Sequence, residues 1–247
     1  MKIVCVGDLE GRSIWKDIIA NENPDITVFL GDYVASRVPE ITPADEIYNL
    51  NELLNYKEEH QDNIFLLRGN HDNEACGYPW ARCWPAADYK VAQWMKENLN
   101  RFLSNTQWIY QIPGTNIICS HAGIGEYFLN ECKKYVESDG ATQSVLNLIN
   151  TIEPNDLFGF TGDRFDNYGY SKTQPCTWIR PVTLSECAIK GYTQVVGHTR
   201  VNKPYRNTTF NGEYFWLCDS LYYNNYLVID NGEFKPKHLE YEIKSNK

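Results

Sequence analysis

Five short polar segments constrain the fold of this chain more than any other feature. They are Gly7-Asp8-Leu9-Glu10-Gly11, Gly31-Asp32-Tyr33-Val34-Ala35, Gly69-Asn70-His71-Asp72, Ser120-His121-Ala122-Gly123 and Gly197-His198-Thr199. Most of them follow a run of apolar, β-prone residues, as the loop after a buried strand would. Loops at the carboxyl ends of the strands of an α/β sheet converge. We therefore expect these segments to meet in space.

Apolar runs and capping signals predict alternating strands and helices over the first 150 residues. Buried strands are predicted at 2–7, 26–31, 64–67 and 116–119, with another at 193–196. Thr42 is a predicted N-cap before Pro43, with Asp45 completing a box, and this helix should end near His60. Further helices are expected over 87–103, 124–137 and 145–152. The alternation predicts parallel strands joined by crossover helices.

The pattern changes after residue 190. Short strands are predicted at 206–210, 214–218, 225–230 and 233–241, with Asn211-Gly212 and Asn231-Gly232 as hairpin turns. An α/β half followed by a β-meander predicts two packed mixed sheets with helices outside. The sequence contains no Gly/Ser linker, charge block or long repeat, so we expect one domain over residues 1–247.

Composition narrows the classes of partner and compartment. The formal net charge of −9 disfavours long nucleic acid and anionic membranes. No apolar stretch approaches the roughly 20 residues of a membrane span. The sequence opens directly on a strand, so no signal peptide is expected. None of the cysteines forms a CxxC pair, which favours reduced thiols and a cytoplasmic location.

The side chains in the five segments predict a metal-dependent reaction. Carboxylate, amide oxygen and imidazole suit divalent ions such as Mn²⁺, Mg²⁺, Fe²⁺ or Zn²⁺. One carboxylate can bridge two ions, and water shared between them becomes hydroxide near neutral pH. Such a nucleophile attacks phosphorus, so a hydrolase of phosphoric esters or anhydrides is the leading hypothesis.

The motifs resemble those of the calcineurin-like metallophosphoesterases, in the same order and over about residues 2–200. More narrowly, they are similar to the branch with Ser/Thr protein phosphatases and symmetrical dinucleoside tetraphosphatases. The resemblance implies a four-layer αββα sandwich and two divalent ions, with Mn²⁺ favoured. It implies that Asp8 and Glu10 hold the first ion, that Asp32 bridges, and that the second ion is held by Asn70, His121 and His198. It also implies that His71 protonates the leaving oxygen and that Arg180, in Trp178-Ile179-Arg180, clamps the phosphate.

Three positions depart from the family pattern. Glu10 stands where the family has histidine, which favours harder ions such as Mn²⁺ or Mg²⁺. Ala35 replaces the aspartate that orients the catalytic histidine in protein phosphatases, so His71 lacks that support. Ser36 takes the place of an arginine, and Arg37, one residue later, is a candidate to serve the phosphate instead.

Ala35 and Asp72 also bear on the substrate, which we expect to be a phosphorylated small molecule, a nucleotide or a phosphoprotein. The motifs that contain Ala35 and Asp72 resemble those of the dinucleoside tetraphosphatases, whose nucleotide leaving group needs less protonation than a serine alkoxide. Nucleotide anhydrides are therefore favoured over phosphoserine.

Other readings stay open. Asp8 or Asn70 alone could be a helix cap, and His121 or His198 alone a satisfied polar side chain. Residues 153–170 could form a lid or an ordinary surface loop. Stacking of Trp80, Arg82 and Trp84 on a nucleobase is less favoured than packing against the helix nearby. The competing function is a non-catalytic phosphate- or nucleotide-binding module of the same fold.

Overall fold

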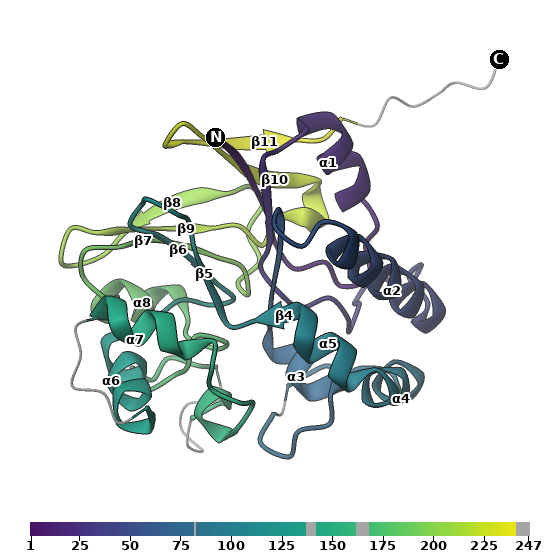
Figure 1. The fold of residues 1–247 in the computed structure, drawn as a ribbon, viewed down its shortest axis with the longest axis horizontal. Helices are drawn as coiled ribbons and strands as arrows, with labels where there is room; N and C mark the ends of the chain where they lie inside the picture. Colours follow the sequence, from purple (N-terminus) through teal and green to yellow (C-terminus); the bar gives the residue numbers. More distant parts are fainter. Residues whose placement is uncertain (82, 137–141, 162–167, 241–247) are drawn as a thin grey trace.

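The computed structural model describes residues 1–81, 83–136, 142–161 and 168–240, and their strands form two sheets that share a buried interface (Figure 1). The first sheet, in the order β11-β10-β1-β2-β3-β4, comprises β1 (Lys2–Val6), β2 (Ile26–Phe29), β3 (Ile64–Leu67), β4 (Thr106–Gln107), β10 (Asn225–Asp230) and β11 (Glu233–His238). The second, in the order β5-β6-β7-β9-β8, comprises β5 (Ile109–Gln111), β6 (Ile117–Ser120), β7 (Thr193–Val196), β8 (Tyr205–Thr208) and β9 (Tyr214–Leu217).

Helices cover the outer face of each sheet. The first group is α1 (Trp15–Glu22), α2 (Pro43–Glu59), α3 (Asn70–Ala75), α4 (Tyr89–Glu97) and α5 (Leu99–Asn105). The second group is α6 (Glu126–Tyr135), α7 (Thr142–Ile149) and α8 (Pro181–Cys187), with a short 3₁₀ turn at Asp156–Phe158. A second 3₁₀ turn, Leu221–Tyr223, packs in the core under the first group. The two groups lie on opposite sides in Figure 1. This is the predicted αββα arrangement of two mixed sheets flanked by helices.

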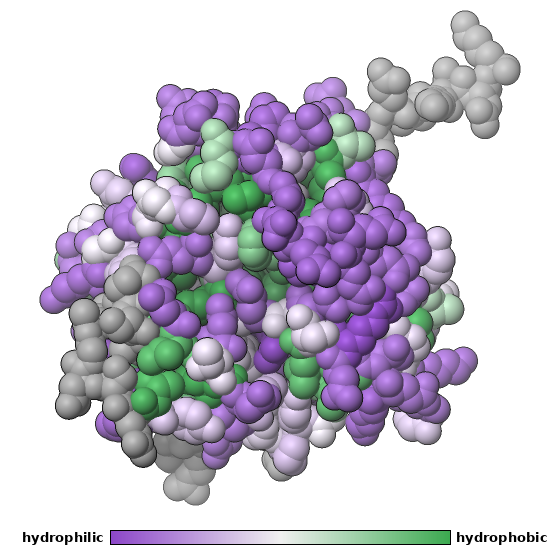
Figure 2. All heavy atoms as spheres, in the orientation of Figure 1, coloured by the Kyte–Doolittle hydropathy of each residue, from purple (hydrophilic) through white to green (hydrophobic). Residues whose placement is uncertain are grey.

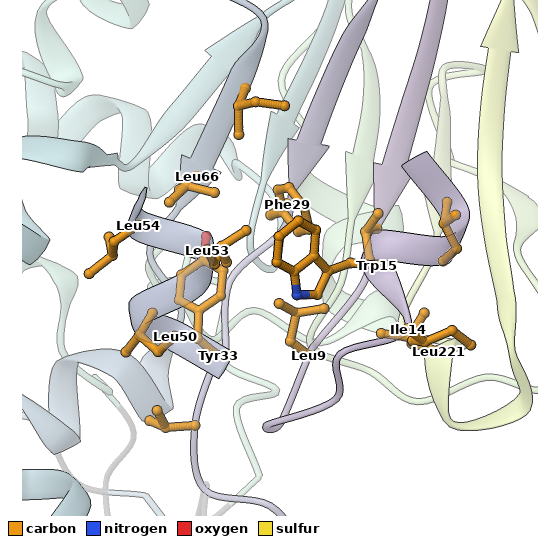
Figure 3. Close-up of a cluster of buried hydrophobic side chains, with 14 of the residues drawn as sticks. Leu9, Ile14, Trp15, Phe29, Tyr33, Leu50, Leu53, Leu54, Leu66 and Leu221 are labelled. Atoms are coloured by element: carbon orange, nitrogen blue, oxygen red, sulfur yellow. The ribbon is translucent and has the colours of Figure 1, made fainter. Parts of the chain in front are cut away.

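The alternating side chains of β1 show how the layers are held together. Val4 and Val6 belong to the core under the first group of helices, where Trp15 and Phe29 meet edge to face at 5.8 Å (Figure 3). Ile3 and Cys5 point the other way, into the core between the two sheets. A strand buried on both faces reads as a continuous apolar run, which is why it could be recognised from sequence.

The solvent side of α2 is strongly hydrophilic (Figure 2).

Most predicted elements are confirmed, and two details are wrong. The Thr42 cap and its box with Asp45 are present. The helix predicted over 87–103 is two helices, because the Asn98 side chain donates to the Trp94 carbonyl oxygen at 2.9 Å and ends the first of them. The last four strands do not form one meander: β8 and β9 join the second sheet, whereas β10 and β11 join the first. Within the described ranges, no helix has both the length and the apolar character needed to cross a membrane.

Candidate metal centre

The predicted ligands lie at the carboxyl ends of parallel strands in both sheets. Asp8, Asp32 and Asn70 follow β1, β2 and β3, which run parallel to one another. His121 and His198 follow the parallel strands β6 and β7. The two sets of strand ends meet, so the backbone N–H of His198 donates to Oδ1 of Asp8, 190 residues away. All five predicted segments are therefore brought together.

Glycines allow this close approach. A side-chain carbon added at Gly69 would lie 2.1 Å from Oδ1 of Asp32, and one at Gly197 would lie 2.4 Å from Oδ1 of Asp8. Gly31 has a φ of +100° and packs against the His121 ring. These positions leave no room for any larger residue while the ligands stay where they are.

Replacing Gly69 with alanine is expected to push Asp32 out of place and to lower both stability and turnover. Overpacking of this kind costs about 1–3 kcal/mol of unfolding free energy. Gly212→Ala is the matched control, because open space surrounds that position and only its φ of +87° is strained. Denaturant unfolding and kcat measured on both variants check the expectation. A Gly69→Ala protein with normal kcat would contradict it.

Four side chains converge on one point. Nε2 of His121 lies 3.0 Å from Oδ1 of Asn70, 3.2 Å from Nδ1 of His198 and 3.4 Å from Oδ2 of Asp32. Nδ1 of His121 donates to the Leu30 carbonyl oxygen at 2.7 Å, which leaves the lone pair of Nε2 directed at the other three. The ligand atoms of Asp32, His121 and His198 all lie within 4.8 Å of one another. Nε2 of His198 is buried without a hydrogen-bond partner in the described structure. This donor set fits a divalent cation.

The electrostatics of the site also favour a cation. Burial works to lower the pKa of His121, but the negative charge of Asp32 outweighs it and raises that pKa to about 10. Burial, followed by the charge of Asp219, raises the pKa of Asp8 well above its ordinary value. Burial also works to raise the pKa of Asp32, but the histidines around it hold that pKa below its ordinary value. The raised pKa values of His121 and Asp8 mean that these side chains bind protons strongly, in part because carboxylates lie close by. The same negative charges attract a metal ion.

Glu10 has different partners from those the resemblance implies. Its Oε2 accepts hydrogen bonds from Arg12 at 3.1 Å and from Arg200 at 2.7 Å. Oε1 accepts a further bond from Arg200 at 2.9 Å. Both carboxylate oxygens are thus engaged by guanidinium groups. Arg200 directly follows the last motif, but nothing in its spacing indicated this pairing.

His71 has two neighbours that bear on its role. Its Nε2 lies 3.5 Å from Nη2 of Arg37, so the arginine does reach the site. Its Nδ1 lies 3.3 Å from Sγ of Cys83, which sequence reasoning missed. Burial raises the pKa of this thiol well above its ordinary value, so it carries no charge. Ala35 is buried and its N–H donates to Glu46 at 2.6 Å. Among the described residues, the His71 ring therefore contacts a neutral thiol and a guanidinium group, and no carboxylate accepts a hydrogen bond from it.

Asp72 does not line the site. Its carboxylate accepts from the backbone N–H groups of Asp32, Tyr33 and Gly69 at 2.8–2.9 Å. Burial, then the charge of Asp32, raises its pKa to about 7. The side chain ties together the loops that carry Asp32 and Asn70, so it acts on the scaffold and does not contact a substrate directly.

A cavity of about 150 Å³ lies over these groups. Its lining consists of Asp8, Glu10, Asp32, Arg37, Asn70, His71, Trp84, Trp178, Arg180, His198, Arg200 and Asp219. Arg180 is held by Nε donating to the Tyr168 carbonyl oxygen at 2.7 Å. A larger hollow of about 540 Å³ lies between α1 and α2, but no such convergence of ligands lines it.

The tryptophans beside the site divide into two roles. Trp80 stacks on Tyr78 at 4.9 Å and packs against the core under α6 and α7, whereas the packing interpretation placed it against the nearby helix α4. Trp84 instead is 88 % exposed and lines the cavity. Arg82 lies outside the described residues, as do 162–167 of the segment predicted to be a lid or loop.

Known proteins resemble the chain in sequence pattern and in fold. Residues 1–137 match the family model described as calcineurin-like phosphoesterase. A cold-active protein-tyrosine phosphatase of a psychrophilic Shewanella species has the same fold, with a TM-score of 0.58, 16 % identity, and coverage of 95 % of this chain and 77 % of that one.

A second solved structure agrees. A protein serine/threonine phosphatase from Saccharomyces cerevisiae, with similarity to human phosphatase PP5, gives a TM-score of 0.52 at 12 % identity, over 99 % of this chain and 82 % of that one. No curated protein matches this sequence. At identities this low, the two solved structures show only a shared fold. The family model, in contrast, matches more than half of the chain and therefore shows the family. The resemblance seen in the motifs is confirmed, and the chain belongs to the calcineurin-like phosphoesterase family.

Proposed function

We propose that this chain hydrolyses phosphoric esters or anhydrides with water activated by two divalent ions, Mn²⁺ being favoured. The family implies metal-dependent phosphoester hydrolysis. The observation that carries the proposal is the convergence of the Asp32, His121 and His198 ligand atoms within 4.8 Å, with Asn70 beside them. These four residues would hold one ion. Asp8 would hold the other and share Asp32, while Glu10 as a ligand stays a prediction.

Bound divalent ions would polarise the phosphoryl oxygens and lower the pKa of water. The residues of the chain supply the other requirements. Arg180 and Arg37 line the cavity and offer guanidinium N–H groups to phosphate oxygens. His71 lies between Arg37 and Cys83, where its imidazole can give a proton to the leaving oxygen. Catalysis of this kind rests mainly on positioning and charge.

Nucleotide anhydrides are the favoured substrates among phosphorylated small molecules, nucleotides and phosphoproteins. The neutral thiol of Cys83 supports an imidazolium less well than a carboxylate would. A general acid whose protonated form is only weakly stabilised is sufficient for a leaving group of low pKa, such as a nucleotide phosphate. Trp84, exposed at the cavity, offers an aromatic surface for a base.

We expect activity to require a divalent ion and to be higher for substrates whose leaving group has a low pKa. With Mn²⁺ present, we expect turnover of diadenosine tetraphosphate and p-nitrophenyl phosphate, and slower turnover of a phosphoserine peptide. EDTA should abolish all three activities, and added Mn²⁺ should restore them. Faster turnover of the phosphopeptide would overturn the substrate preference. Failure to bind metal, with no turnover of any substrate, would favour the non-catalytic binding module.

A further inference from the structure

Asp219 occupies a position equivalent to those of the predicted ligands, although no motif pointed to it. Strand β9 runs parallel to β7, and Asp219 lies two residues beyond the end of β9. Asp8 and His198 likewise lie two residues beyond the ends of β1 and β7. The parallel strands β6, β7 and β9 of the second sheet therefore each carry one ligand-type side chain at the same edge.

The backbone places Asp219 directly beside Asp8. A side-chain carbon added at Gly7 would lie 2.3 Å from the Cys218 carbonyl oxygen and 2.7 Å from Cα of Asp219. The segment Gly7-Asp8 thus lies against Cys218-Asp219 with no room between them. Both carboxylates line the same cavity of about 150 Å³, which also contains Asp32.

In the described part of the chain, the carboxylates of Asp8 and Asp219 are buried and form no ion pair. Asp219 and Asp8 are each only 4 % exposed. Across the described ranges, no basic nitrogen lies within 4.0 Å of either carboxylate, and that of Asp219 accepts no hydrogen bond. Buried charge without a partner costs several kcal/mol, so such a pair favours a cation.

Glu10 is in the opposite situation. Arg12 and Arg200 both bind its carboxylate, which gives the three side chains a net charge of +1. A divalent ion that took Glu10 as a ligand would have to displace the guanidinium hydrogen bonds and lie beside two positive charges. Asp219 offers the same carboxylate chemistry and accepts no guanidinium hydrogen bond in the described structure, although the positive charge of Arg200 also acts on it.

We propose that Asp219, together with Asp8 and the shared Asp32, binds the first divalent ion, and that Arg12 and Arg200 keep Glu10 out of the coordination. The inference rests on the proposed function, because it assigns a ligand within the same two-metal site. Glu10 then serves to fix Arg200, which lines the cavity.

Measuring manganese binding distinguishes between Asp219 and Glu10 as the ligand of the first ion. The full-length protein, Asp219→Asn and Glu10→Gln are dialysed against a series of MnCl₂ concentrations, and the bound manganese per chain is measured. We expect the unaltered protein and Glu10→Gln to bind two ions. Asp219→Asn should retain one and bind the other at least about 10-fold more weakly, as loss of a metal-site partner does. Its electron paramagnetic resonance spectrum should change from that of a coupled pair to that of an isolated Mn²⁺.

Unaltered manganese binding by Asp219→Asn, or loss of one ion in Glu10→Gln, would overturn the inference. An unaltered protein that binds no manganese would instead overturn the proposed function, so the two failures are distinguishable.

Thermal unfolding in EDTA excludes a merely structural role. Removing an unpaired buried charge should raise the metal-free midpoint of Asp219→Asn, and added Mn²⁺ should raise it further by less than in the unaltered protein. Asp230→Asn is the control, because that carboxylate pairs with Lys235 at 3.4 Å and lies away from the site. A lower metal-free midpoint for Asp219→Asn would show that its carboxylate supports the fold and would overturn the assignment.

Discussion

Replacing Asp32 with asparagine is expected to lower kcat on the order of 10³-fold or more, because in the proposed site this carboxylate would serve both ions. Its Oδ2 lies 3.4 Å from Nε2 of His121, while Oδ1 accepts from the His71 N–H at 2.9 Å. The side chain therefore connects the ligand cluster to the predicted acid. The neutral amide keeps the size of the side chain but loses the charge. Steady-state hydrolysis of p-nitrophenyl phosphate with saturating Mn²⁺ measures the loss.

The matched control is Asp62→Asn, which removes an exposed carboxylate after α2. It should leave kcat and manganese content unchanged. Near-normal turnover by Asp32→Asn, with the control behaving as expected, would refute the bridging role.

Replacing His71 with asparagine is expected to impair poor leaving groups far more than good ones. Proton donation to the leaving oxygen contributes about 10²–10⁴-fold when the leaving group is a poor one. p-Nitrophenolate needs little protonation, whereas an alkoxide from an alkyl phosphate needs much. The backbone N–H of residue 71 still reaches Oδ1 of Asp32, so the metal ligands should stay in place.

The measurement is kcat/KM for a series of aryl and alkyl phosphates with both proteins. A steeper dependence on leaving-group pKa in the variant supports His71 as the acid. Equal losses across the series would mean that His71 acts in another way. Manganese content of the variant serves as the control for an intact site.

Local sequence patterns revealed the strand ends but not all the partners that meet there. Asp8, Asp32 and Asn70 each follow an apolar run buried on both faces, and such runs are visible in sequence. Asp219 also follows a predicted strand. Because that strand was expected in an antiparallel meander, its carboxyl end gave no reason to place Asp219 with the others. Only the parallel pairing of β9 with β7 brings it to the site.

Side-chain pairs across long loops were equally invisible. Cys83 reaches His71 from 12 residues away through an irregular segment, and Arg200 reaches Glu10 across 190 residues. No periodicity or capping signal encodes such contacts. The division of 87–103 at Asn98 was missed for a related reason, since a helix-compatible residue ended the helix through its own side-chain hydrogen bond.

The most direct test of the metal centre is a crystal structure of the chain soaked in MnCl₂, with anomalous diffraction recorded. We expect an anomalous peak within about 2.5 Å of ligand atoms from Asp32, Asn70, His121 and His198. A second peak is expected beside Asp8. Saturated crystals without a peak among those four side chains would contradict the account.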